Sequence, residues 1–89
     1  MSKLQSDDIC DVLTRGIAEE RALMADIISR IVRLENQLAE LLGQPDPDPA
    51  AIEALQRDIE FQNGELATAQ ERLAHLEADY SFAGCATRL

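Results

Sequence analysis

Apolar residues recur at alternating spacings of three and four along two long runs, and a proline-rich segment separates the runs. The positions of the first run are Cys10, Leu13, Ile17, Glu20, Met24, Ile27, Ile31, Leu34, Leu38 and Leu41, and those of the second are Ile52, Leu55, Ile59, Gln62, Leu66, Ala69, Leu73, Leu76 and Tyr80. A repeat of about 3.5 residues keeps one narrow stripe of a helix facing a partner helix over many turns. The pattern therefore predicts an all-α fold in which two helices form a coiled coil, and we call these two sets of residues the seam.

Capping signals set the expected bounds of the first helix. Ser6 is a favourable N-cap residue, and the acidic residues that follow it favour the positive end of the helix dipole. The first helix should therefore span about residues 6–42, with residues 1–5 disordered. Gly43 can adopt the left-handed conformation that often ends a helix, and the prolines beyond it cannot continue one.

The second helix should begin at Asp48-Pro49, because aspartate is a good N-cap and proline suits the first helical position. This leaves a turn at residues 43–48, and the helix should run to about residue 80. Asn63-Gly64 lies inside it and is a turn signal in other contexts, so a continuous helix and a kinked one are the two alternatives. Residues 81–89 are expected to form a C-terminal tail that frays unless it docks.

A short connection between two helices of similar length makes them antiparallel neighbours. Pairing the two halves of the seam places Leu41 opposite Ile52, and it brings Arg30 beside Glu65 as an exposed ion pair. Since a single hairpin buries little apolar surface, we expect two copies to associate as a four-helix bundle.

Two polar residues interrupt the seam. In the predicted register, Glu20 lies within reach of Arg72 and Arg21, which indicates an ion pair that sets the register. The alternative is a docking site in a weakened stretch of the coiled coil. Gln62 should face Ile31, where a single polar side chain specifies the partner at some cost in stability.

The two cysteines can meet if the tail folds back. Extending the antiparallel register past residue 80 brings Cys85 close to Cys10. The chain shows no secretory signal and no apolar run of bilayer length, so we expect a cytoplasmic protein with reduced thiols. Mild oxidation should then form an intramolecular disulfide.

Charge and residue content exclude several classes of function. The formal net charge is −9, from 17 acidic and 8 basic residues, which opposes direct binding to nucleic acid. A zinc site built from Cys10, Cys85 and His75 would lack a fourth ligand, and His75 is expected to be solvated. No pattern indicates a catalytic group, and a two-helix hairpin offers no deep pocket for a small-molecule substrate. We therefore expect no enzymatic activity, no cofactor, no metal and no membrane association.

The first helix carries apolar residues outside the seam, and these predict its interface with a partner. They are Leu23, Ile28, Val32, Ala39 and Leu42, whereas the neighbouring shoulder of the second helix is polar, with Gln56, Asn63, Gln70 and Glu77. An apolar face that its own hairpin cannot cover is typical of a protein–protein interface.

The sequence thus favours a non-enzymatic interaction module, such as an adaptor, a regulator or an assembly subunit, which binds itself or another protein through the first helix. One alternative is a small acidic inhibitor that mimics DNA on the basic surface of a nucleic-acid-binding protein. A second is a precursor peptide whose helices guide a modifying enzyme to the cysteine-containing tail. Each alternative makes a different use of the same acidic helical hairpin.

Overall fold

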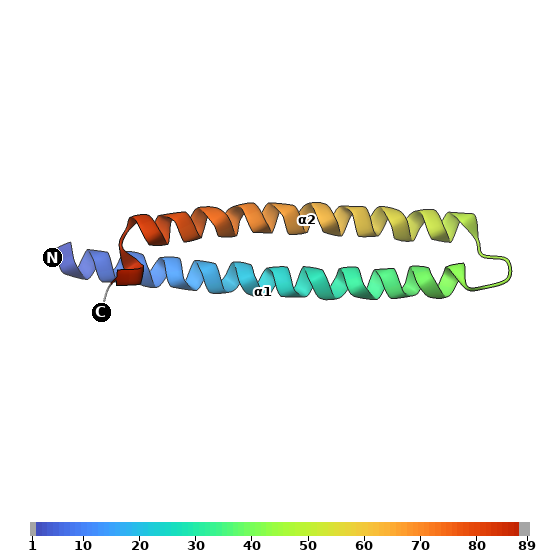
Figure 1. The fold of residues 1–89 in the computed structure, drawn as a ribbon, viewed down its shortest axis with the longest axis horizontal. Coiled ribbons are helices and arrows are strands. Elements are labelled where there is room, and N and C mark those ends of the chain that lie inside the picture. Colours follow the sequence, from blue (N-terminus) through green and yellow to red (C-terminus); the bar gives the residue numbers. More distant parts are fainter. Residues whose placement is uncertain (1, 88–89) are drawn as a thin grey trace.

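The computed structural model describes residues 2–87, with side chains placed for residues 9–86. Helix α1 (Ser2–Leu42) and helix α2 (Pro49–Phe82) lie side by side and antiparallel, and the short 3-10 helix η1 (Cys85–Thr87) returns the chain to α1 (Figure 1). The molecule is a rod of 68 × 17 × 16 Å. The predicted all-α antiparallel hairpin is confirmed.

The seam forms the contact between the two helices. Each of its residues is buried or half-buried, including the polar Glu20 and Gln62. The best-buried cluster lies near the middle of the rod, where Ile27 and Ile31 of α1 meet Ala69 of α2. Ala69 is fully buried, because its small side chain lets the two helices approach closely there.

The start of α1 differs from the prediction. The helix begins at Ser2, so residues 2–5 are helical and Ser6 lies inside the helix, away from its N-cap position. Lys3 and Gln5 are good helix formers, and no proline or glycine interrupts this stretch. The seam pattern cannot show this extension, because the seam begins only at Cys10.

Helix α1 does not end with the left-handed glycine that the sequence predicts. The Gly43 N–H donates to the carbonyls of Ala39 and Glu40 at 3.1 and 3.2 Å, and the Gln44 N–H donates to Leu41 at 3.2 Å. These bonds tighten the last turn, and Gly43 keeps a negative φ. The left-handed closure expected at this glycine is therefore wrong.

Helix α2 is continuous through Asn63-Gly64. At its start the Asp48 carboxylate accepts a hydrogen bond of 3.0 Å from the Ala50 N–H, which satisfies one of the free amides of the first turn. The Thr68 hydroxyl donates to the Gly64 carbonyl at 3.1 Å. Of the two alternatives for this stretch, the structure has the unbroken helix.

The chain beyond α2 turns back toward α1. The Ala83 N–H caps the helix by donating to the Asp79 carbonyl at 2.9 Å, and the Gly84 N–H donates to Ser81 at 3.1 Å. Gly84 has a φ of 75°, in the left-handed region that only glycine adopts readily. This reversal of direction carries Cys85 to α1, so the described residues beyond α2, 83–87, dock on α1, the condition under which the tail was expected not to fray.

Two glycines should respond to alanine in opposite ways. Gly64→Ala should raise the free energy of unfolding by up to about 1 kcal/mol, because alanine favours a helix interior, and a Cβ at this site meets no atom within 4 Å. Gly84→Ala should lower it by about 1–2 kcal/mol, because a left-handed φ is unfavourable for residues with a Cβ. Urea unfolding monitored by circular dichroism measures both changes. Equal effects of the two substitutions would contradict the assigned backbone conformations.

Within residues 9–86, two ion pairs join the helices, and both involve neighbouring residues of α1 toward the termini. Arg72 Nε lies 2.8 Å from Glu20 Oε1, and Arg21 lies 3.0 Å from Glu77. The expected pair between Arg30 and Glu65 is not among the ion pairs of residues 9–86. The hydrogen bond to Glu20 raises the pKa of Arg72, and the negative charge of Glu65 raises it further, although desolvation opposes both. Glu65 thus raises the pKa of Arg72, which lies one heptad further along the same helix.

A double-mutant cycle should separate the observed pair from the predicted one. Combining Glu20→Gln with Arg72→Gln should show a measurable favourable coupling in urea unfolding, because the Glu20 carboxylate is partly buried. The same cycle on Arg30 and Glu65 should give a coupling near zero. A larger coupling at Arg30 than at Arg72 would contradict the observed arrangement of charges.

Candidate protein-interaction surface

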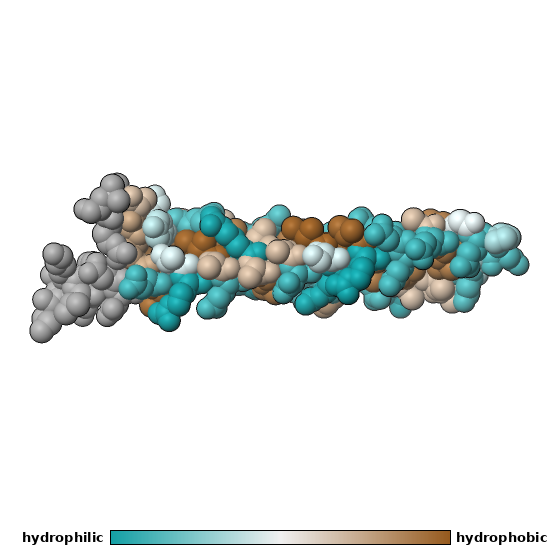
Figure 2. Space-filling model, turned by 90° about the horizontal axis from the view of Figure 1, so that it is seen from below, coloured by the Kyte–Doolittle hydropathy of each residue, from teal (hydrophilic) through white to brown (hydrophobic). Residues whose placement is uncertain are grey.

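One outward face of α1 carries the apolar residues predicted as an interface. Ile28, Val32 and Leu42 are 47%, 48% and 54% exposed, and Ala39 is exposed between the last two. We call these four residues the α1 stripe. Figure 2, which looks at the hairpin from the α1 side, shows apolar surface near the middle of the rod, bordered by hydrophilic groups. The polar shoulder of α2 is exposed and leaves the stripe uncovered.

Leu23 was predicted to be part of the interface, but it does not lie on this stripe. Its side chain is half-buried and packs against the cluster of Ile27, Ile31 and Ala69. Leu23 precedes Ile28 by five residues, which is a rotation of about 140° around a helix. It therefore lies on the opposite shoulder of α1, where it contributes to the hairpin itself.

Two shallow hollows lie between the helices on the side of the stripe, and each has a volume of about 400 Å³. The first, which we call the Ala18 hollow, lies toward the termini and is lined by Thr14, Ile17, Ala18, Arg21, Glu77 and Tyr80. The second, the Ala39 hollow, lies toward the turn and is lined by Glu35, Leu38, Ala39, Leu42, Gln56 and Ile59. Alanine on α1 leaves space beside the seam at both places.

The opposite shoulder presents an aromatic residue that the sequence reasoning missed. Phe61 is exposed and lines a hollow of about 270 Å³ together with Arg30, Arg33 and Gln62. The Gln62 Oε1 atom is buried there without a hydrogen-bond partner. The sequence feature that could have indicated this surface is a bulky aromatic residue, Phe61, directly before the polar seam residue Gln62.

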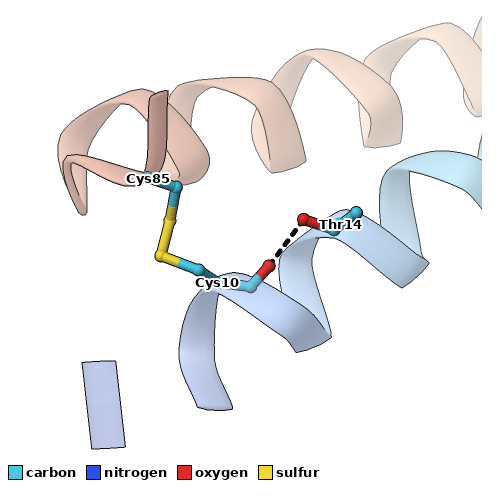
Figure 3. Close-up of a disulfide and its surroundings, with 3 residues drawn as sticks. All are labelled: Cys10, Thr14 and Cys85. Carbon is cyan, nitrogen blue, oxygen red and sulfur yellow. Dashed lines mark hydrogen bonds between the residues drawn. A yellow bond between two sulfur atoms is a disulfide. The ribbon is translucent and has the colours of Figure 1, made fainter. Parts of the chain in front are cut away.

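A disulfide closes the open end of the hairpin. Cys10 and Cys85 are bonded, with their Cα atoms 5.6 Å apart, and both residues are buried (Figure 3). The Thr14 hydroxyl donates to the Cys10 carbonyl at 2.7 Å. The predicted approach of the two cysteines is confirmed, but the expectation of reduced thiols is wrong for this structure. Residue patterns do not encode the redox state of the surroundings.

The disulfide engages two of the three residues of the possible zinc site, Cys10 and Cys85. Both sulfur atoms are bonded to each other, so they do not join His75 as ligands. Within residues 9–86 no group of three or more histidine, cysteine, aspartate and glutamate side chains has a geometry that could hold a metal ion. At the end of the hairpin opposite the turn, the disulfide therefore links α1 covalently to the segment after α2, and we call this link the staple.

Neither helix in the described part of the chain is long and apolar enough to cross a membrane. The cytoplasmic location stays a prediction. Comparison with known proteins adds no family: no family model matches the chain, and neither a curated protein nor a solved structure matches it.

Proposed function

We propose that the protein is a non-enzymatic coiled-coil interaction module that binds protein through the α1 stripe. The observation that supports it best is the exposure of Ile28, Val32 and Leu42 along one face of a helix whose seam is already packed. Exposed apolar residues scattered singly are common, whereas a row of them at helical spacing is typical of a docking face. An adaptor, a regulator and an assembly subunit all need such a face.

Surface area supports the need for a partner. The hairpin has an accessible surface of 6628 Å², whereas a compact monomer of its mass exposes about 5,200 Å². The excess is larger than the roughly 800 Å² that each partner buries in an interface of standard size. We expect the hairpin to gain the most stability when α1 packs against another helix. Two copies of the chain provide such a contact in a four-helix bundle with α1 at its centre.

Sedimentation equilibrium at micromolar concentration tests this proposal. The expected mass is about twice the chain mass of 9.8 kDa, and the dimer should tighten between about 50 and 500 mM salt. Burial of apolar surface is not screened by salt, while the repulsion between two acidic chains is. A chain that stays monomeric and binds a basic protein only at low salt would contradict the proposal and favour the acidic mimic.

A further inference from the structure

We infer that the α1 stripe binds a second copy of this chain in one antiparallel arrangement, with the two-fold axis beside residue 30 of α1 and Leu42 of each copy seated in the Ala18 hollow of the other. The inference rests on the proposed function and adds the partner's register. Three features of the exposed face lead to it: its apolar centre, its hollows and its two charged residues.

Ile28 and Val32, the first two residues of the α1 stripe, are self-complementary in this arrangement. An interface with two-fold symmetry makes each contact twice, so residues at equal distances from the axis face each other. With the axis beside residue 30, Ile28 faces Val32 of the partner subunit, and Val32 faces the partner's Ile28. The two residues of the stripe nearest the axis are then covered together, although each is about half exposed in the single hairpin.

The hollows fit the same axis. Ala18 and Leu42 lie equally far from residue 30, so Leu42 of the partner subunit arrives at the Ala18 hollow. Leu42 is 54% exposed and projects from the last turn of α1, whereas the hollow has an apolar floor of Ile17 and Tyr80. A protruding side chain on each copy therefore meets a depression on the other.

The charges that line the stripe favour the antiparallel direction. Arg21 and Glu35 lie on the same face, on either side of Ile28. In the inferred dimer, Arg21 of the partner subunit reaches the Ala39 hollow, of which Glu35 forms one wall. Arg21 is paired with Glu77 of its own chain, so its guanidinium would bridge Glu77 and the other copy's Glu35, which makes no ion pair within residues 9–86. A parallel dimer would instead place the two copies of Glu35 against each other, which opposes association.

Neighbouring registers are unfavourable. Sliding one copy by a heptad in one direction places Val32 against Glu35 of the partner subunit, and sliding it in the other direction places Val32 against the partner's Arg21. Both shifts set a charged group on the apolar centre, where it would lose water without a matched ion pair. Of these three registers, the one with its axis beside residue 30 keeps charged residues away from Ile28 and Val32.

Spin labels on introduced cysteines test the arrangement. In the oxidised protein Cys10 and Cys85 are bonded, so Gln44→Cys or Ser29→Cys supplies the one free thiol for labelling. Helical rise predicts that labels at the turn lie about 40 Å apart in the antiparallel dimer, and that labels at position 29, beside the axis, lie within roughly 20 Å. A parallel dimer brings both pairs of labels within roughly 20 Å, and that result would overturn the inference.

A shape swap tests the seat of Leu42. Ala18→Leu should fill the Ala18 hollow, and Leu42→Ala should remove the side chain that occupies it in the dimer. Each substitution should therefore weaken dimerisation at least tenfold. The double variant restores one large and one small side chain at each contact and should recover most of the affinity. Both sites are exposed in the hairpin, so helicity measured at low concentration confirms that the variants fold. A dimer that forms without rescue by the double variant overturns this arrangement but leaves the proposed function intact, whereas a wild-type monomer overturns both.

Discussion

Replacing Ile28 and Val32 together with glutamate should convert the dimer into a monomer at micromolar concentration. Each copy would bring two carboxylates to the centre of the interface, where they would be desolvated beside the like charges of the other copy. We expect the dissociation constant to rise by at least 100-fold, about 3 kcal/mol, together with a fall in helicity. Sedimentation equilibrium and circular dichroism measure the two effects.

Val12→Glu with Phe61→Glu is the matched control. Val12 and Phe61 are 57% and 63% exposed, so the pair adds the same charge at sites that are somewhat more open to solvent and lie outside the α1 stripe. This variant should remain dimeric. If both double variants dissociate to the same extent, net charge and not the stripe controls association.

Loss of the disulfide should cause the largest change in stability. The bond links residues 75 positions apart in sequence, and closing a loop of that size stabilises the folded chain by about 4 kcal/mol in the chain-entropy model. Cys10→Ser with Cys85→Ser should therefore lower the free energy of unfolding by about that amount. Urea unfolding of this variant beside the oxidised wild type gives the difference, and a loss below about 1 kcal/mol would contradict the role of the staple.

Hydrogen exchange should locate that loss. Amides near Cys10 and Cys85 should exchange faster in the variant, because the bond holds the end of the rod that has no connecting turn. The core around Ile27 and Ala69 should keep more of its protection. In a cytoplasm that keeps thiols reduced, the hairpin would lack this staple and would depend more on association for its stability.

The seam was the part of the fold that could be predicted in detail. A strict spacing of three and four leaves only one face for the partner helix, so it identified the buried Ala69 as well as the half-buried Glu20. The continuity of α2 through Gly64 was open from the sequence, because local propensity and tertiary packing favour different outcomes there.

Leu23 could have been placed correctly from spacing, because five residues from Ile28 is a rotation of about 140° to the other shoulder of the seam. Other features depend on geometry that spacing does not contain. The Arg30–Glu65 pair was placed by register, yet long side chains near one another choose among several partners. The disulfide depends on a reversal at Gly84 that lies beyond the last seam residue and on an oxidant that no residue pattern encodes.

Methyl NMR with a soluble paramagnetic probe tests most directly whether the α1 stripe docks on protein. In a single hairpin, Val32 and Val12 are 48% and 57% exposed, so the probe should broaden their methyl signals to similar extents. The proposed interface predicts that at high micromolar concentration Ile28 and Val32 are protected while Val12 remains accessible. Equal broadening of Val32 and Val12 at every concentration, with a monomeric mass, would contradict the assignment of the stripe as the docking surface.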